Sequence, residues 1–340
     1  MSTIVSFPGL GLELPVSRVA FSIGGFDVYW YGVVIAAGLA LGMLYALKRS
    51  KTFGVDPDKL MDLIIVGVIF GVLGARVYYI VFSTPGSFTT LAQMIDIRDG
   101  GLGFYGAVIG AFAAVGVACR IKKVKILPVL DIGSIGFLIG QGIGRWGNFF
   151  NQEAFGCNTT LPWGMTSETV QRYLQSHLSS LQAQGMTVDP MLPVHPTFLY
   201  ESLWCILGFF LLNAYVKHRR FDGELCLMFF AWNGANRAIV EGLRTDSLYL
   251  GGVRISQLLA AVGTVLAIAA ILWIRGRIKK APGSIVPWAQ TDAWAQELAA
   301  VEAREAAGKK SGKTAPEAGK TDAPQGNAEN TPGDGEGDIL

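Results

Sequence analysis

Four polar residues that lie close together near the middle of the chain could bind an anion. Arg145, Asn148, Asn151 and Glu153 end a long apolar run in which no other residue after Asp131 is charged. Residues three apart lie on one face of a helix, so we expect Arg145 and Asn148 to project toward the same interior. A guanidinium group donates hydrogen bonds in a geometry that matches phosphate and carboxylate oxygens. These residue types in an apolar setting therefore indicate an anion site.

A second group of charges lies in the apolar run of residues 225–243. Asn233, Arg237, Glu241 and Arg244 are spaced four, four and three apart, which places all four on one face of a helix. An arginine near the centre of a membrane helix costs about 2.5 to 3.5 kcal/mol unless it is paired or hydrated. Glu241 is the expected partner of Arg237. A structural ion pair that fixes helix packing is one interpretation of this group.

The number of arginines favours a second interpretation, in which the cluster binds a phosphate. Arg145, Arg237 and Arg244 are expected at a similar depth, and Arg76 stands near the end of another apolar run. They outnumber the nearby carboxylates, which are Glu153, Glu201 and Glu241. In a bilayer the abundant anion is a lipid phosphate, so we expect an anionic lipid as the ligand.

The composition places these residues in a membrane. The chain has 340 residues, of which 51% are hydrophobic and 16% charged, and its mean hydropathy is +0.40. A soluble domain of this size carries more charge, so we predict an all-α polytopic membrane protein. The four cysteines have no spacing typical of a disulfide framework or a metal cluster, and no glycine loop that cradles a nucleotide phosphate is present. We expect no metal, no cofactor and no nucleic-acid partner.

Seven apolar runs are long enough to cross a bilayer. They cover residues 23–47, 60–82, 102–119, 127–149, 197–216, 225–243 and 253–274. Every second connector is basic, beginning at residues 48–51 and ending at residues 275–280. By the positive-inside rule the basic connectors face the cytoplasm, which places the N-terminus outside and the C-terminus inside. The polar clusters then lie toward the extracytoplasmic side.

Glycines recur in two of these runs at a spacing that favours close helix packing. Gly136, Gly140 and Gly144 are four residues apart, as are Gly106 and Gly110. Glycines at this spacing lie on one helix face and let a neighbouring backbone approach closely. We expect both faces to be helix contacts.

Two segments outside the runs are polar. The loop of residues 151–196 is long enough to form a small extracytoplasmic cap, in which residues 168–181 predict a short amphipathic helix on the membrane surface. We favour a structural cover over a substrate lid. Residues 281–340 lack the apolar side chains of a core and predict a disordered cytoplasmic tail, apart from a short helix near 294–307. The transmembrane domain is therefore expected to comprise residues 1–280.

Three further residues stand where a run begins, at the expected boundary of the membrane. Tyr31 and Tyr105 are typical of interfacial anchors. His195 precedes a proline at the start of the fifth run, where a capping or loop role is more common than a catalytic one.

One long motif resembles the signature of the bacterial prolipoprotein diacylglyceryl transferases. It reads Gly-x-Gly-Arg145-x-Gly-Asn148-Phe-x-Asn151-x-Glu153-x-x-Gly156. Three more stretches agree in content and order, namely Tyr31-Gly32, His195-Pro-x-x-Leu-Tyr200-Glu201 and Arg237-x-x-x-Glu241-x-x-Arg244. The resemblance covers about residues 23–274 and leaves out the tail.

The resemblance implies a multi-pass enzyme of the bacterial inner membrane. Such enzymes transfer the diacylglyceryl group of phosphatidylglycerol to the lipobox cysteine thiol of a preprolipoprotein signal peptide, forming a thioether and releasing glycerol phosphate. Arg145 and Arg237 would hold the phosphate leaving group. The resemblance also implies that the remaining site residues position the lipid or Arg237, namely Asn148, Asn151, Glu153, Tyr31, His195, Glu241 and Arg244.

The group that takes the thiol proton is left open. Some members of the family have a histidine where this chain has Tyr105. The candidates are therefore a phosphate oxygen and the side chains of Tyr105, Glu153, His195 and Glu241. Asn233 stands where some members have a tyrosine, and we give it no catalytic role.

Two other functions are compatible with an arginine cluster in a membrane. A non-catalytic transporter or flippase would move an anionic lipid without cleaving it, and a structural subunit would use the arginines only for packing. The lack of an inverted repeat and the gathering of polar residues toward one membrane face disfavour the transporter.

Overall fold

The computed structural model describes residues 2–84, 88, 90–96, 100–183, 185–243, 249–250 and 253–313. Contacts divide the chain into two compact units, Met1–Leu298 and Ala299–Leu340. The first unit holds the helix bundle and all the predicted site residues that the structure describes. In the second, the described residues belong to the later part of one helix, α11 (Asp292–Lys313).

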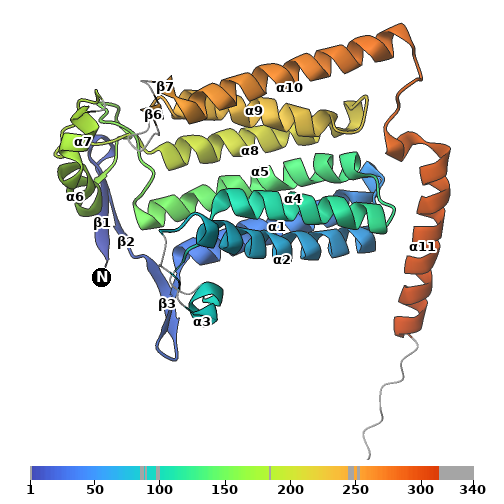
Figure 1. Cartoon of the computed structure of the whole chain (residues 1–340), viewed down its shortest axis with the longest axis horizontal. Helices are drawn as coiled ribbons and strands as arrows, with labels where there is room; N and C mark the ends of the chain where they lie inside the picture. Colours follow the sequence, from blue (N-terminus) through green and yellow to red (C-terminus); the bar gives the residue numbers. More distant parts are fainter. Residues whose placement is uncertain are drawn as a thin grey trace, which may run out of the picture. The chain divides into compact units, whose positions relative to one another are not determined.

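Seven long helices lie side by side in the described part of the first unit, and successive helices run in opposite directions (Figure 1). They are α1 (Trp30–Phe53), α2 (Pro57–Val81), α4 (Phe104–Ile121), α5 (Ile126–Asn151), α8 (Thr197–Tyr215), α9 (Glu224–Val240) and α10 (Ile255–Lys280). Among the described residues, six of these helices are long and apolar enough to cross a membrane. The other, α9, has 17 residues and ends earlier than the predicted run of 225–243. The structure therefore supports a multi-pass protein with six candidate spans.

Helix α5 lies at the centre of the bundle, packed against α1, α8 and α9. Half of its apolar stretch is buried within the protein, compared with 11 to 33% in the other candidate spans. Its glycines explain the closest contact, because Gly136 and Gly140 lie against Gly42 and Gly38 of α1. A Cβ atom on Gly42 would lie 2.7 Å from the carbonyl oxygen of Gly136. The predicted close-packing face of α5 is thus confirmed.

Helices α2 and α4 form a second close pair through glycines. A Cβ atom on Gly106 would overlap the carbonyl oxygen of Gly74, and one on Gly110 would overlap that of Phe70. The prediction for Gly106 and Gly110 is confirmed. The short helix α3 (Leu91–Ile95) follows α2 and is linked to it by Arg76, which donates hydrogen bonds to backbone carbonyl groups in this region.

A buried carboxylate fixes the start of α9. Asp131 of α5 is fully buried and accepts hydrogen bonds from the backbone N–H groups of Gly223 and Cys226, both at 2.8 Å. The first N–H groups of a helix have no partner within the helix, so a carboxylate there satisfies them. The adjacent Glu224 pairs with Arg275 of α10 at 2.6 Å. These contacts hold α5, α9 and α10 together at the end of the bundle that carries the basic connectors, which we call the basic end.

The opposite end of the bundle carries a small cap with its own apolar core, and we call this the cap end (Figure 1). The cap contains an antiparallel sheet of order β2-β1-β5, formed by β1 (Thr3–Phe7), β2 (Leu12–Val16) and β5 (Thr166–Ser167), with the 3-10 helix η1 (Pro8–Leu10) between the first two. Helices α6 (Glu168–Ser176) and α7 (Leu178–Ala183) follow β5. Val170, Leu174 and Leu181 are buried in this core together with Val5. The predicted surface orientation of the 168–181 segment is therefore wrong, because its apolar face packs inside the cap.

The all-α prediction also needs correction, because the described residues form three small sheets. Besides the cap sheet, β3 (Val19–Ile23) pairs with β4 (Phe26–Tyr29), and β6 (Tyr249–Leu250) pairs with β7 (Val253–Arg254). Gly24 and Gly25 join β3 to β4 with φ values of 56° and 86°. Adjacent residues with positive φ form the tight turn of a β-hairpin. Hence the first long helix begins at Trp30, later than the predicted residue 23.

Residues 281–313, the described part of the chain after α10, contain more secondary structure than their composition predicted. The 3-10 helix η3 (Trp288–Gln290) places Trp288 against the loop after α1, and the Trp288 N–H group bonds Asp222 at 2.8 Å. Helix α11 extends over Asp292–Lys313, where a short helix at 294–307 was expected. Its sequence is rich in alanine, glutamate and lysine, which have high helix propensity.

The 3-10 helix η2 (Val216–His218) directly follows α8.

Candidate functional site

An open cavity of about 1080 Å³ lies between the helices of the bundle and is lined by five of the predicted site residues. They come from four different helices, Tyr31 from α1, Tyr105 from α4, Arg145 and Asn148 from α5, and Arg237 from α9. Most of the remaining lining is apolar or glycine, including Ile35, Gly38, Leu39, Gly136 and Phe137. The cavity thus has a polar part around two arginines and a long apolar wall.

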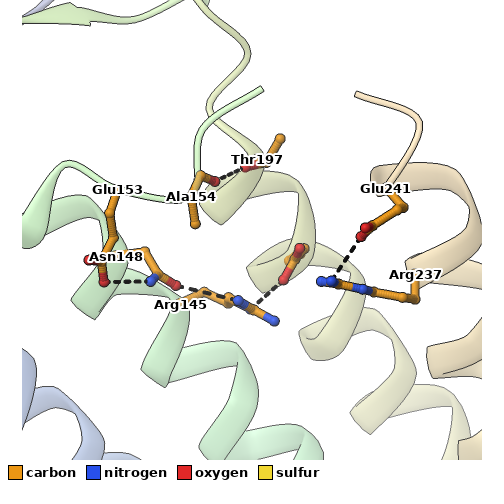
Figure 2. Close-up of polar contacts among 8 residues, drawn as sticks. Arg145, Asn148, Glu153, Ala154, Thr197, Arg237 and Glu241 are labelled. Carbon is orange, nitrogen blue, oxygen red and sulfur yellow. Dashed lines mark hydrogen bonds and ion pairs between the residues drawn. The ribbon is translucent and has the colours of Figure 1, made fainter. Parts of the chain in front are cut away.

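Arg145 is held by a carboxylate of the neighbouring helix. Its Nε forms an ion pair with Glu201 of α8, whose side chain is 3% exposed, whereas that of Arg145 is 24% exposed. Its Nη1 also donates a long hydrogen bond of 3.4 Å to Asn148 Oδ1 (Figure 2). A guanidinium group has five N–H donors in a planar fork, so these contacts fix the group and leave it donors for a further ligand.

Arg237 of α9 is also held by a buried carboxylate, as Arg145 is. Its Nη2 lies 2.8 Å from Glu241 Oε2, and the other oxygen of Glu241 accepts a hydrogen bond of 2.5 Å from Ser256 Oγ on α10. The Arg237 side chain is 39% exposed and that of Glu241 is 2% exposed. Figure 2 shows Arg145 and Arg237 extending toward one another from opposite sides. The predicted Arg237–Glu241 pair is confirmed, and two positive groups line one cavity.

The end of α5 is shaped by a cluster of amides around Glu153. Asn148 and Asn151 both donate to Glu153 Oε1, at 3.0 and 3.2 Å. Gln152 and Ala154 have φ values of 54°, a left-handed conformation that turns the chain back at the helix end and brings Glu153 beside Asn148. Glu153 is therefore fixed by two side-chain amides.

A second pocket of about 720 Å³ adjoins the cavity, because Tyr31 lines both. Arg18, Asp27, Asn151 and Glu153 lie in its wall. Arg18 Nη2 donates to the carbonyl oxygen of Asn151 at 3.1 Å. Asn151 and Glu153 thus face this smaller pocket, while Asn148 bridges Arg145 and Glu153.

His195 is placed apart from both hollows. It lies in the cap, where its Nδ1 is 3.1 Å from the hydroxyl of Tyr200, which in turn accepts a hydrogen bond of 2.7 Å from Trp163 Nε1. Burial lowers the pKa of the His195 imidazole from its ordinary value. The structure therefore gives His195 a place in the cap and not in the lining of the arginine cavity.

The structure changes the argument from the number of arginines. Arg76 uses its guanidinium group on the carbonyl oxygens of Gln93, Met94, Gly100 and Gly101, at 2.7 to 3.2 Å. These hydrogen bonds hold the segment between α2 and α4 against α2, and Arg76 does not line the cavity that contains Arg145 and Arg237. Arg145 and Arg237 each have a carboxylate partner, and Arg244 lies outside the described residues. The cavity therefore offers an anion two positioned arginines, each paired with a carboxylate, and its described residues carry no excess of positive charge.

Two supporting residues were not assigned a role from the sequence. The sequence places Glu201 among the carboxylates near the arginines and in a motif, but it does not show that Glu201 is the partner of Arg145. Ser256 carried no recognisable signal, because a serine at the start of an apolar run is common. Its contact with Glu241 depends on the packing of α9 against α10.

These features define a class, a multi-pass membrane protein whose helix bundle holds an open cavity with two carboxylate-paired arginines. A family model described as "Prolipoprotein diacylglyceryl transferase" matches residues 18–273. The chain is 41% identical over 246 residues to the phosphatidylglycerol–prolipoprotein diacylglyceryl transferase of Finegoldia magna, covering 72% of this chain and 90% of the relative. It is 34% identical to the protein of the same name from Clostridioides difficile, over 78% of this chain and 98% of that relative. The chain belongs to the prolipoprotein diacylglyceryl transferase family, as its motifs predicted.

Proposed function

We propose that this protein transfers the diacylglyceryl group of phosphatidylglycerol to the cysteine thiol of a preprolipoprotein. The relatives from Finegoldia magna and Clostridioides difficile carry the name of this activity. The observation that carries the proposal is the pair of guanidinium groups, Arg145 and Arg237, in a single cavity with an apolar wall. Such a cavity suits a lipid whose phosphate binds the arginines and whose acyl chains contact the wall.

In the reaction, the cysteine sulfur attacks the glycerol carbon that bears the phosphate. The new C–S bond forms as the C–O bond to the phosphate breaks, and the electron pair of that bond leaves with glycerol phosphate. Arg145 and Arg237 neutralise the charge that develops on the leaving oxygen. Glu201 and Glu241 hold the two guanidinium groups in position, so little reorganisation is needed when the charge appears.

The proton of the thiol must pass to an acceptor, because thiolate is the nucleophile. Tyr105 lines the cavity, and Glu153 lines the adjoining pocket and touches Asn148. His195 lines neither hollow, which makes it the weakest candidate. We retain Glu153, Tyr105, Glu241 and an oxygen of the lipid phosphate as acceptors.

We also propose that all seven long helices span the bacterial inner membrane, with the cap outside and the basic end in the cytoplasm. The cavity arginines would then face the extracytoplasmic side, residues 1–280 would form the catalytic domain, and residues 281–340 a cytoplasmic tail. The positive-inside rule supports this orientation. Ser179→Cys in the cap and Lys217→Cys at the basic end, each in a chain with Cys157→Ser, test it. A membrane-impermeant maleimide applied to spheroplasts should label only the first.

The activity is tested by glycerol phosphate release. Purified protein in phosphatidylglycerol vesicles should release glycerol phosphate only when a lipobox peptide with its cysteine is present, and the peptide should gain the mass of diacylglyceryl. Arg145→Ala and Arg237→Ala should each reduce the rate by at least 100-fold, about 2.7 kcal/mol in the barrier. Arg172→Ala, at an exposed ion pair of the cap, is the matched control. A wild-type protein that binds the lipid but releases nothing would instead support the alternative function of an anionic-lipid transporter.

A further inference from the structure

Gln141 is a polar side chain that the proposed reaction leaves unused. It lies on α5 four residues before Arg145, so the two share a helix face, and it lines the same cavity. Its carbonyl oxygen Oε1 is buried and has no hydrogen-bond partner among the residues that the structure describes. Buried polar atoms in proteins are nearly always paired, so this oxygen indicates a ligand that supplies a donor.

The chemistry of the two substrates decides which of them provides that donor. Oε1 is an acceptor, and the diacylglyceryl part of the lipid has only ester oxygens, which are acceptors too. The hydroxyl groups of the lipid lie beyond the phosphate, in the head group. A peptide backbone, in contrast, has an N–H donor at almost every residue, and in an apolar cavity each of them requires a partner.

The depth of Gln141 fits the peptide segment next to the reacting cysteine. Gln141 is about 6 Å further from the cap end than Arg145 along the helix axis, at 1.5 Å per residue. The thiol has to reach the carbon beside the phosphate that Arg145 holds. An extended peptide advances about 3.3 Å per residue, so the N–H groups of the two residues before the cysteine fall near Gln141.

The immediate neighbours of Gln141 on α5 add no polar side chain that could compete for the ligand. Gly140 faces Gly38 of α1 and Gly142 faces Cys205 of α8, so both positions are filled by helix packing. The space beside the amide is therefore the cavity that Gln141 itself lines. A side-chain amide can then accept from a peptide N–H group and donate to the neighbouring peptide C=O group.

We propose that Gln141 is a positioning residue that binds the backbone of the preprolipoprotein beside its cysteine and so aligns the thiol with the lipid. The proposal rests on the transferase function and adds a recognition element for the peptide. It requires no particular side chain in the substrate, so it suits an enzyme that accepts many preproteins with a short common motif.

Backbone-modified peptides test this directly on the wild-type enzyme. Three analogues of one lipobox peptide carry an ester oxygen in place of a single N–H group, at the cysteine and at each of the two residues before it. In phosphatidylglycerol vesicles we expect one analogue to react with a kcat/KM about tenfold lower than that of the parent peptide, because its acceptor partner Oε1 is left unpaired. If all three analogues react like the parent, the proposal is overturned.

The variant Gln141→Met separates recognition from structure, since methionine has a similar length and no hydrogen-bonding amide. It should lower kcat/KM for the parent peptide about tenfold, leave the KM for phosphatidylglycerol unchanged, and lose all discrimination against the sensitive analogue. Gln171→Met in the cap is the matched control and should discriminate as the wild type does. The same discrimination in Gln141→Met as in the wild type would overturn the proposal, while a wild type inactive on the parent peptide would overturn the transferase function itself.

Discussion

Glu201 of α8 forms an ion pair with Arg145 of α5 and is almost completely buried, with 3% of its side chain exposed. The two residues are 56 positions apart in the chain, and their contact joins α5 to α8 at a residue that lines the cavity. The Glu201 carboxylate engages Nε and Asn148 engages Nη1, so the guanidinium group is held from two sides. The pair therefore both stabilises the bundle and orients a cation, and its two roles can be measured separately.

Loss of the Glu201 carboxylate should destabilise the protein. Glu201→Ala leaves the Arg145 guanidinium group without its partner in a mostly buried position, which we expect to lower the free energy of unfolding by about 3 kcal/mol. Equilibrium unfolding in mixed micelles measures the change. Glu168→Ala, which breaks an exposed pair with Arg172, should cost about 0.5 kcal/mol or less. Equal losses in the two variants would contradict a structural role of the buried pair.

Neutralising Glu241 should affect catalysis more than lipid binding. Glu241→Gln keeps an acceptor for Ser256 but removes the charge that fixes Arg237, so we expect kcat to fall by about 10- to 100-fold with a smaller change in the KM for phosphatidylglycerol. Steady-state glycerol phosphate release separates the two constants. Ser256→Ala retains the ion pair and should reduce kcat by no more than about fivefold. A large rise in KM with an unchanged kcat would show that Arg237 contributes only to binding.

The stability of the cap should depend on pH through His195. Burial lowers the pKa of His195 in the folded state below its ordinary value of 6.5. In the window below 6.5 the unfolded chain therefore binds more protons than the folded one, so stability falls as pH decreases and is regained above 6.5. Unfolding midpoints between pH 7.5 and 5 should fall less steeply in His195→Gln than in the wild type. A slope in His195→Gln equal to that of the wild type would contradict the prediction.

Substitution of Gly54 should reveal the contact made by Trp288. Gly54 ends α1 with a φ of 81°, and a Cβ atom there would lie 2.6 Å from Trp288 Cδ1. Gly283 has a φ of 83° and open space around it. Gly283→Ala should cost about 1 kcal/mol from backbone strain, and Gly54→Ala about 2 to 3 kcal/mol because steric overlap is added. Thermal unfolding checks the difference. If the two variants lose equal stability, Trp288 does not pack on this loop in the protein.

Local sequence patterns were sufficient to predict the long helices but not the strands. A run of about twenty apolar residues buries its backbone polar groups only as a helix, so the predicted runs coincide with the long helices except at their ends. The strand β1 could not be predicted, because it is stabilised by β2 and by β5, which lies about 160 residues further along the chain. The early end of α9 at Val240 is followed by the C-cap Glu241 and then Gly242, a helix stop signal inside the apolar run that was predicted to continue to residue 243.

The sequence by itself determined the class of protein, the close-packing glycines and the Arg237–Glu241 pair, because each depends on hydrophobicity or on spacing along one helix. Only the tertiary structure decided which carboxylate holds Arg145, that Arg76 ties a loop to α2, that His195 belongs to the cap, and that Gln141 faces the cavity. The physical reason is that a charge or an amide in an apolar helix must find a partner, but the identity of that partner depends on which helices are neighbours. Which distant segments of the chain become neighbours depends on tertiary packing, and a local sequence pattern does not contain that information.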